Sequence, residues 1–217
     1  KDEYALYNHY TFDLATAIGD WQSGKKTPIV TPHYADGFTF VGDNHHYFKG
    51  AAVLYALHHE IGDSAFFTGI KNYVQRYQFK GASTSDFRNE MEVSSGKKLD
   101  WFFNQWVYKA GIPEFEVASV YNKPDNKITL RLTQTQQTDT AILYPLSHYF
   151  GGSMSIEIDK QKHDIALDAQ QVNEFVFHNI DSAPASVVVD ANRHWIAIFK
   201  DEKTTDEWIK QLDFTDN

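Results

Sequence analysis

The chain has 217 residues, of which 42% are hydrophobic and 15% aromatic, enough to bury the core of one or two domains and too many for a disordered segment. Its formal net charge is -9, and no run of lysines or arginines could neutralise a row of phosphates, which excludes nucleic acid as a partner. The longest apolar stretch, Ala51 to Leu57, is far shorter than the roughly 20 residues of a membrane-spanning helix, so no membrane partner is expected.

The first predicted element is a helix over residues 4–18, where apolar residues recur at helical spacings and Gly19 offers a stop. The chain begins with Lys1 rather than Met and has no signal sequence, which predicts that it starts inside a longer protein. Residues 20–42 contain prolines and glycines and follow neither the helical nor the strand period, so they predict an ordered loop. Loops of this length inside compact domains are often functional.

A helical hairpin is predicted next. Residues 45–61 place Val53, Leu54, Leu57 and Ile61 on one helix face, Gly62 breaks the helix, and a second helix follows over about residues 64–77.

Two further helices are predicted before Pro113, where the spacing of the apolar residues changes. Thr84 or Ser85 is expected to cap the first of them, and Gly96 stands where a left-handed C-terminal residue belongs. Asp100 is expected to cap a short aromatic helix over residues 101–108. Its aromatic side chains recur at helical spacing and are predicted to lie in the core; they are Trp101, Phe102, Phe103 and Trp106.

After Pro113 the two-residue alternation of strands replaces the helical spacing, and turn signals such as KPDN separate the runs. This pattern predicts a small antiparallel β-sandwich. The predicted organisation is a helical part over residues 1–113, the sandwich over 114–200, and the start of a following helical segment over 201–217. The strand-like runs cover residues 114–121, 128–133, 153–158, 162–167, 175–177, 185–190 and 195–199.

Three strings of the sequence resemble the aminopeptidase N family of zinc metallopeptidases. They are the TPIVTPHY loop, YFKGA with the helical hairpin that follows it, and SGKKLDWFFNQWVYKAGIPEFEV. The strings occur in the family's order and with family-like spacing over about residues 25–118. The resemblance implies an α+β fold, in which the helical C-terminal subdomain of a thermolysin-like catalytic domain is followed by a small antiparallel β-sandwich.

The resemblance also implies that the zinc ligands lie outside this chain. In the family, two histidines of an H-E-x-x-H helix and a glutamate of the next helix hold the zinc, and both helices would precede Lys1. The strand of the G-A-M-E-N type, which holds the substrate's amino end, would precede Lys1 as well. Zinc is therefore expected in the intact enzyme and none on this fragment, which is expected to be inactive alone. The expected partners are peptide substrates with a free N-terminus and the upstream catalytic half of the same protein.

Tyr47 is the catalytic candidate that the resemblance supplies. It matches the family's tyrosine whose hydroxyl donates a hydrogen bond to the oxyanion formed at the scissile carbonyl, and a neutral phenol suits that role. The alternative is a tyrosine that merely packs at a helix start. Lys49 and Gly50 are assigned structural roles, the lysine pairing locally or reaching solvent and the glycine allowing close backbone approach. Phe48 departs from the family pattern, which more often has an acidic residue or proline there.

Two histidine motifs are read as structural. His59 and Glu60 imitate the start of a zinc helix, but the position four residues after His59 is Asp63, so the second ligand is missing. His45 and His46 are adjacent, point in different directions along a helix and make a poor chelating pair. They are predicted to lie on the surface, or to support the residues that contact a ligand directly.

The sequence leaves two functions open. The first is a fragment of a zinc-dependent aminopeptidase that removes N-terminal residues from peptides by means of metal-activated water. The alternative is a non-catalytic peptide- or protein-binding module on a degenerate peptidase scaffold, because the edge of a sandwich can accept a strand. The presence of Tyr47 in its motif favours the enzyme. The absence of cysteine is compatible with a reducing or an oxidising compartment.

Overall fold

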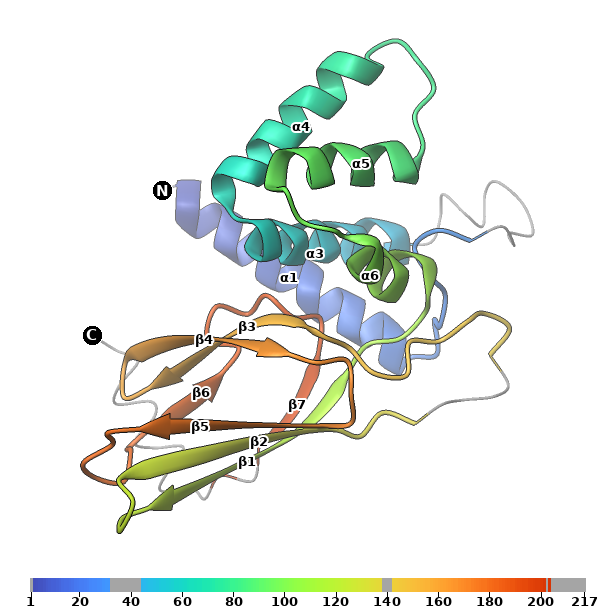
Figure 1. The fold of residues 1–217 in the computed structure, drawn as a ribbon. Helices are drawn as coiled ribbons and strands as arrows, with labels where there is room; N and C mark the ends of the chain where they lie inside the picture. The colour runs from blue at the N-terminus through green and yellow to red at the C-terminus, as the bar shows by residue number, and fades with distance from the viewer. Residues whose placement is uncertain (1, 32–43, 138–141, 202, 204–217) are drawn as a thin grey trace. The chain divides into compact units, whose positions relative to one another are not determined.

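A computed structural model of the chain describes residues 2–31, 44–137, 142–201 and 203 (Figure 1). The chain forms two compact units, a helical unit of residues 1–111 with 139–147 and a β unit of residues 112–138 with 148–217. Residues 32–42 of the predicted loop at 20–42, and residues 202 and 204–217 of the helical segment predicted over 201–217, lie outside the described residues.

The helical unit opens with α1 (Asp2–Gln22), which packs against α3 (Asn44–Ile61). The rings of Tyr10 and Tyr55 stack between these helices, with centroids 3.8 Å apart. The predicted end of the first helix at Gly19 is wrong, because Gly19 keeps a helical backbone and the helix continues for another turn. The chain leaves the helix at Gly24, whose φ of 98° suits a residue without a side chain.

The predicted hairpin is present as α3 and α4 (Asp63–Tyr77), with Gly62 at a φ of 82° between them. Helix α5 (Thr84–Ser95) lies against α4 (Figure 1) and ends at Gly96 in the left-handed conformation, as predicted. Its N-cap is Ser83 rather than Thr84 or Ser85. The Ser83 hydroxyl and the Asp86 backbone N–H form one half of a capping box, and the Asp86 carboxylate accepts the Ser83 backbone N–H.

The predicted aromatic helix consists of α6 (Asp100–Phe103) and a π-helical turn, η1 (Asn104–Tyr108). Asp100 does not cap it; the N-cap is Leu99, and the Asp100 carboxylate pairs with Arg88 at 2.5 Å. Phe102 and Phe103 are buried as predicted, whereas Trp101 is 40% exposed.

Residues 142–147 belong to the helical unit although they fall inside the range predicted for the sandwich. The backbone N–H of Ala110 donates to Pro145, and the N–H of Ser147 donates back to Ala110. The Ser147 hydroxyl also donates to the Gln105 carbonyl at 2.9 Å. Backbone pairing of this kind cannot be predicted from a period, since the segment contains no strand.

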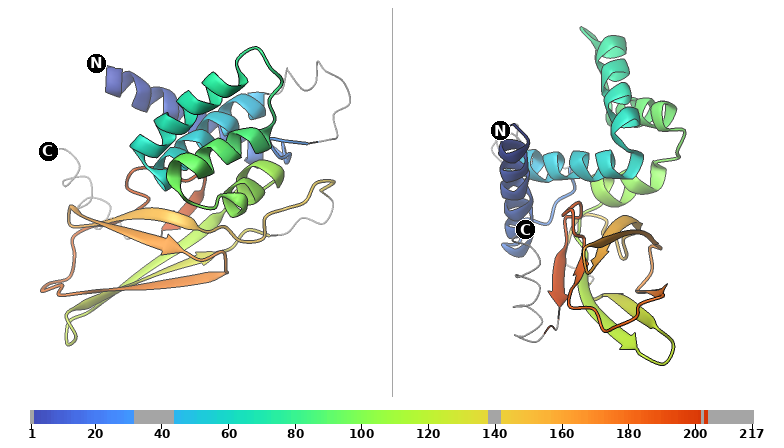
Figure 2. Two further views of the ribbon diagram at one scale, coloured as in Figure 1. Left: turned by 45° about the horizontal axis from the view of Figure 1, so that its top comes forward. Right: turned by 90° about the vertical axis from the view of Figure 1, so that its left-hand side faces the viewer.

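The β unit is a two-layered sandwich (Figure 2). One sheet has the order β5-β2-β1-β7 and the other the order β4-β3-β6. Every strand pair is antiparallel except β1 with β7, which run parallel. Each of the seven predicted runs overlaps a strand, although the run over 195–199 shares only residues 198 and 199 with β7. Their bounds are β1 (Glu114–Asn122), β2 (Lys127–Gln134), β3 (Gly152–Ile158), β4 (Gln161–Leu167), β5 (Val172–His178), β6 (Val187–Val189) and β7 (Ile198–Asp201).

The core of the sandwich follows from the register. Val117 lies opposite Leu132, and Leu132 opposite Asn173, so alternate residues of β1, β2 and β5 share the inner face. Ile156 and Ile165 supply buried side chains from the second sheet. Apolar side chains thus meet between two layers, which is the arrangement that the alternation predicts.

Candidate active site

Tyr47 lies in the first turn of α3, and its side chain is 63% exposed. It lines a pocket of about 430 Å³ that belongs entirely to the helical unit. The Tyr47 hydroxyl makes no hydrogen bond within the described part of the chain. Its donor is therefore available to a group that enters the pocket.

The phase of α3 explains why Tyr47 points outward. Val53 and Leu57 are buried one turn apart and fix the inner face of the helix. Tyr47, Ala51 and Leu54 follow one another at spacings of four and three residues, so they share an exposed face that adjoins the buried one. This face forms one wall of the pocket.

Aromatic side chains form the other wall of the pocket. Phe87 comes from α5, while Phe102 and Phe103 come from α6. Val107 of η1 joins them, and its carbonyl accepts the backbone N–H of Val30 at 3.0 Å. Apart from Tyr47, His46 and Thr84, the side chains that line the pocket are apolar.

The sequence reading missed this second wall. It assigned Phe102 and Phe103 to the core, which is correct, but no sequence signal shows that buried rings also border an open pocket. The required information is the position of α6 against α3, a matter of tertiary packing.

Phe48 contacts the neighbouring helix rather than the pocket. Its ring meets that of Phe12 in α1 edge to face, with centroids 5.7 Å apart. The position at which the sequence departs from the family pattern therefore helps to join α1 to α3.

The side chain of Lys49 is in a different environment from the one predicted. The lysine was expected to pair locally or reach solvent, yet its side chain is 1% exposed. Its ammonium has no hydrogen-bond partner within the described ranges. This burial lowers the pKa of Lys49 to about 8, because the charged form loses its hydration.

Gly50 lines the pocket from the same turn of α3. A Cβ atom built on it would meet nothing within 4 Å. The close backbone approach expected from a glycine is therefore not made by any described residue of this chain.

His46 also lines the pocket, beside Tyr47, and is partly exposed. The structure does not describe the side chain of His45. A single histidine at the pocket cannot replace a set of metal ligands.

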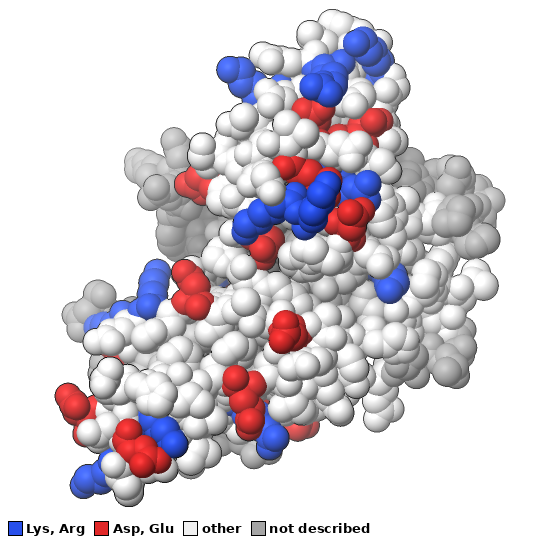
Figure 3. Space-filling view, viewed as in Figure 1, with Lys and Arg blue, Asp and Glu red and all other residues white. Residues whose placement is uncertain are grey.

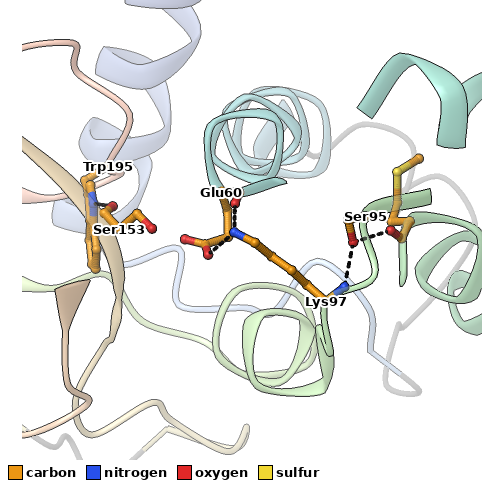
Figure 4. Close-up of polar contacts among 6 residues, drawn as sticks. Glu60, Ser95, Lys97, Ser153 and Trp195 are labelled. Carbon is orange, nitrogen blue, oxygen red and sulfur yellow. Dashed lines mark hydrogen bonds and ion pairs between the residues drawn. The ribbon is translucent and has the colours of Figure 1, made fainter. Parts of the chain in front are cut away.

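The other histidine motif, His59 with Glu60, lies at the end of α3. The Glu60 carboxylate pairs with Lys97 at 3.3 Å, and the Lys97 ammonium also donates to the Glu60 carbonyl (Figure 4). The neighbouring His58 pairs with Asp63 at 2.6 Å. Within residues 2–31, 44–137, 142–201 and 203, no three histidine or acidic side chains are placed to hold a metal ion.

Charged side chains of both signs lie on the face of the molecule that Figure 3 shows. On the face shown in Figure 3, acidic and basic side chains are interspersed over both units. Several are paired, such as Arg131 with Glu174 on the outer face of the first sheet. Among the helices that the structure describes, none has the length and apolar character needed to cross a bilayer.

The sequence and the fold of this chain are similar to those of known peptidases. Residues 7–106 match the Peptidase family M1 domain. A crystal structure of Legionella pneumophila aminopeptidase A in complex with aspartic acid shares the fold over 93% of the chain, with a TM-score of 0.75 and 17% sequence identity. The predicted α+β fold is confirmed, and so is the predicted resemblance to the aminopeptidase N family.

Individual relatives narrow the similarity to aminopeptidases. Probable aminopeptidase 1 of Sulfurisphaera tokodaii is 26% identical over 187 residues, which are 85% of this chain and 22% of that protein. Aminopeptidase N of Escherichia coli is 26% identical over 154 residues, which are 66% of this chain and 18% of that protein. The chain thus spans about a fifth of the length of these relatives.

Proposed function

We propose that this chain forms the C-terminal part of the catalytic domain, together with the following β-sandwich, of a zinc-dependent aminopeptidase. The observation that carries the proposal is the position of Tyr47. It stands in the YFKGA string at the rim of an open pocket, with a hydroxyl that no described residue engages. The substrates in this proposal are peptides with a free N-terminus.

Tyr47 contributes electrostatic stabilisation in this function. When water attacks a peptide carbonyl, negative charge develops on the carbonyl oxygen. A phenol held on a helix can donate its O–H to that oxygen without prior reorganisation, and such a donor is worth more in the transition state than in the ground state. Tyr47 does not have to give up its proton for this role.

The metal would be held by another part of the protein. Among the described histidine and acidic side chains, no group of three is placed to hold a metal ion, and His58 and Glu60 pair with Asp63 and Lys97. They do not fit a zinc site, so we assign no reaction step of this chain to the metal. In the proposed enzyme, the part that precedes this chain holds the zinc.

Replacement of the hydroxyl tests the role of Tyr47. In the polypeptide extended upstream by a catalytic domain, Tyr47→Phe is expected to lower kcat by about 10²–10³, as the loss of an oxyanion donor does elsewhere, and to leave zinc content unchanged. Hydrolysis of an aminoacyl-anilide gives kcat, and elemental analysis gives the zinc content.

Tyr55→Phe is the matched control, since it removes a hydroxyl from the same helix away from the pocket. It should keep near-normal turnover. Near-normal turnover of Tyr47→Phe would show that the Tyr47 hydroxyl has no role in catalysis. An extended protein that neither binds zinc nor cleaves would support a peptide- or protein-binding module instead.

A further inference from the structure

Strand β5 is an edge strand with one open side. Within the described part of the sandwich it pairs with β2 alone, so its other side has no neighbouring strand (Figure 1). The ring of Phe177 meets that of His163 in β4, with centroids 4.9 Å apart, so the second sheet covers the inner face of β5. What remains open is the row of backbone groups along its edge.

The other edge strands are protected against pairing with another chain, whereas β5 is not. Among the described strands, β6 has three residues, β7 has four and contains Lys200, and β4 contains Lys162. Short strands and lysines commonly keep an edge from pairing. Strand β5 has seven residues and contains no lysine or proline. Its apolar residues are Val172, Phe175, Val176 and Phe177.

The register shows which backbone groups of β5 face the open side. The Gln134 N–H donates to the Gln171 carbonyl at 2.8 Å, and in an antiparallel pair such hydrogen-bonded pairs recur at every second residue. The odd-numbered residues of β5 therefore turn their backbone groups to β2. Those of Glu174, Val176 and His178 point to the open edge, and the side chains of these three residues are exposed.

We propose that β5 pairs antiparallel with β5 of a second copy of this chain, which joins the two four-stranded sheets into one. The sequence of β5 is self-complementary about Val176. With the two-fold axis there, Val176 lies opposite its own copy, and Glu174 lies opposite His178 of the second copy. An axis at Glu174 would instead set two carboxylates opposite each other, which is unfavourable. This inference is independent of the proposed function.

The local charges permit the contact although the whole chain is acidic. The formal net charge of -9 opposes association, but charges farther apart than about 8 Å are largely screened at physiological ionic strength. The rows that would meet are not acidic, because Lys127 stands beside His178 and Arg131 pairs with Glu174. A second copy always brings the matching side chains, whereas a strand of an unrelated protein need not.

Sedimentation of the purified chain tests the association. A contact through one strand is small and therefore weak. The weight-average mass of the wild-type chain should rise above 24.9 kDa as its concentration approaches about 1 mM. Val176→Lys would set two lysines opposite each other and should weaken the association about fivefold or more.

Val120→Lys is the matched control. Val120 is 65% exposed and lies in the same row as Val176, but in β1, which has a strand on each side. This variant should associate like the wild type. Equal weakening by the two variants would overturn the proposal. A wild-type chain that stays monomeric up to about 1 mM would also overturn it and would leave the edge to a strand of another protein.

Disulfide crosslinking tests the register directly. The chain has no cysteine, so Val176→Cys introduces a single thiol. The Cα atoms of a hydrogen-bonded antiparallel pair lie about 5.5 Å apart, a separation that a disulfide spans. On mild oxidation, Val176→Cys should form a linked dimer at least about tenfold faster than Val120→Cys, although position 120 is the more exposed of the two. Equal rates of dimer formation would overturn the pairing about Val176.

A charge exchange tests the pairing of Glu174 with His178. His178→Glu alone sets two glutamates opposite each other at both ends of the contact and should weaken the dimer several-fold. Addition of Glu174→His restores opposite partners and should recover most of the association. A double variant as weak as His178→Glu would overturn the proposed register.

Discussion

At the scale of single residues, Lys49 gives the fold a dependence on pH. It lies in a helix stripe that continues with Val53 and Leu57, so an ammonium occupies a position suited to an apolar side chain. The pKa of Lys49 falls from its usual 10.5 to about 8 because the buried charge is desolvated. Since the unfolded chain holds this proton up to pH 10.5, the contribution of Lys49 to stability improves as the pH rises from about 8 to 10.5.

We expect Lys49→Met to stabilise the chain at pH 7 by up to about 3 kcal/mol, because methionine carries no charge that must be desolvated. The advantage should shrink between pH 8 and pH 10.5, where folded wild-type protein loses the proton. Urea unfolding at pH 7 and pH 10 measures both differences. Lys71→Met, which removes an exposed lysine from α4, is the control and should show no such trend. A constant difference between Lys49→Met and wild type would mean that the ammonium is solvated.

The sequence names Tyr47 as a candidate but says much less about its surroundings. Tyr47 stands in a string with recognisable neighbours, which is why the sequence points to it. The burial of Lys49 does not, because the same K-G pair is compatible with a lysine that reaches solvent. The aromatic wall formed by Phe102 and Phe103 depends on how α6 packs against α3, and a helical period specifies only which face is apolar.

At the scale of secondary-structure elements, the contact between α4 and α5 depends on Gly69. A Cβ atom there would lie 2.7 Å from the Met91 sulfur and 2.8 Å from the Ser94 hydroxyl. Met91 is fully buried and has little room to move. We expect Gly69→Ala to lose about 1–3 kcal/mol to overpacking, which exceeds the gain of up to about 1 kcal/mol in helix propensity.

Gly19→Ala is the matched control, since Gly19 is also inside a helix but has open space around its Cβ position. It should gain about 0.5–1 kcal/mol. Urea unfolding of both variants gives the comparison, and a Gly69→Ala protein more stable than wild type would show that the α4–α5 contact can relax.

Elements with strong local signals were predicted well. Gly62 and Gly96 adopt positive φ angles at the ends of their helices, and alternation located the strands. The exact start of α5 was harder to predict. Three consecutive residues, Ser83 to Ser85, are all acceptable N-caps, and the structure uses Ser83. The parallel pairing of β7 with β1 is a long-range choice that a two-residue period does not specify.

At the scale of the whole molecule, the two units differ in how much apolar surface they leave open. The β unit has a closed apolar core between its sheets, whereas the helical unit keeps Tyr47 and an open apolar pocket at its surface. An exposed apolar pocket beside a candidate catalytic residue is typical of an interaction site. The candidate site therefore lies in the helical unit.

The isolated chain is expected to be inactive. Because its described histidine and acidic side chains form no metal-binding group, we expect the purified chain to bind no zinc and to leave an aminoacyl-anilide intact. A polypeptide extended upstream by the length of a catalytic domain should bind one zinc ion and release the anilide. Zinc stoichiometry and hydrolysis, measured in parallel on both proteins, separate the alternatives. Hydrolysis by the isolated chain would contradict the proposed division of the active site, while failure of both proteins to bind zinc would favour a binding module on a peptidase scaffold.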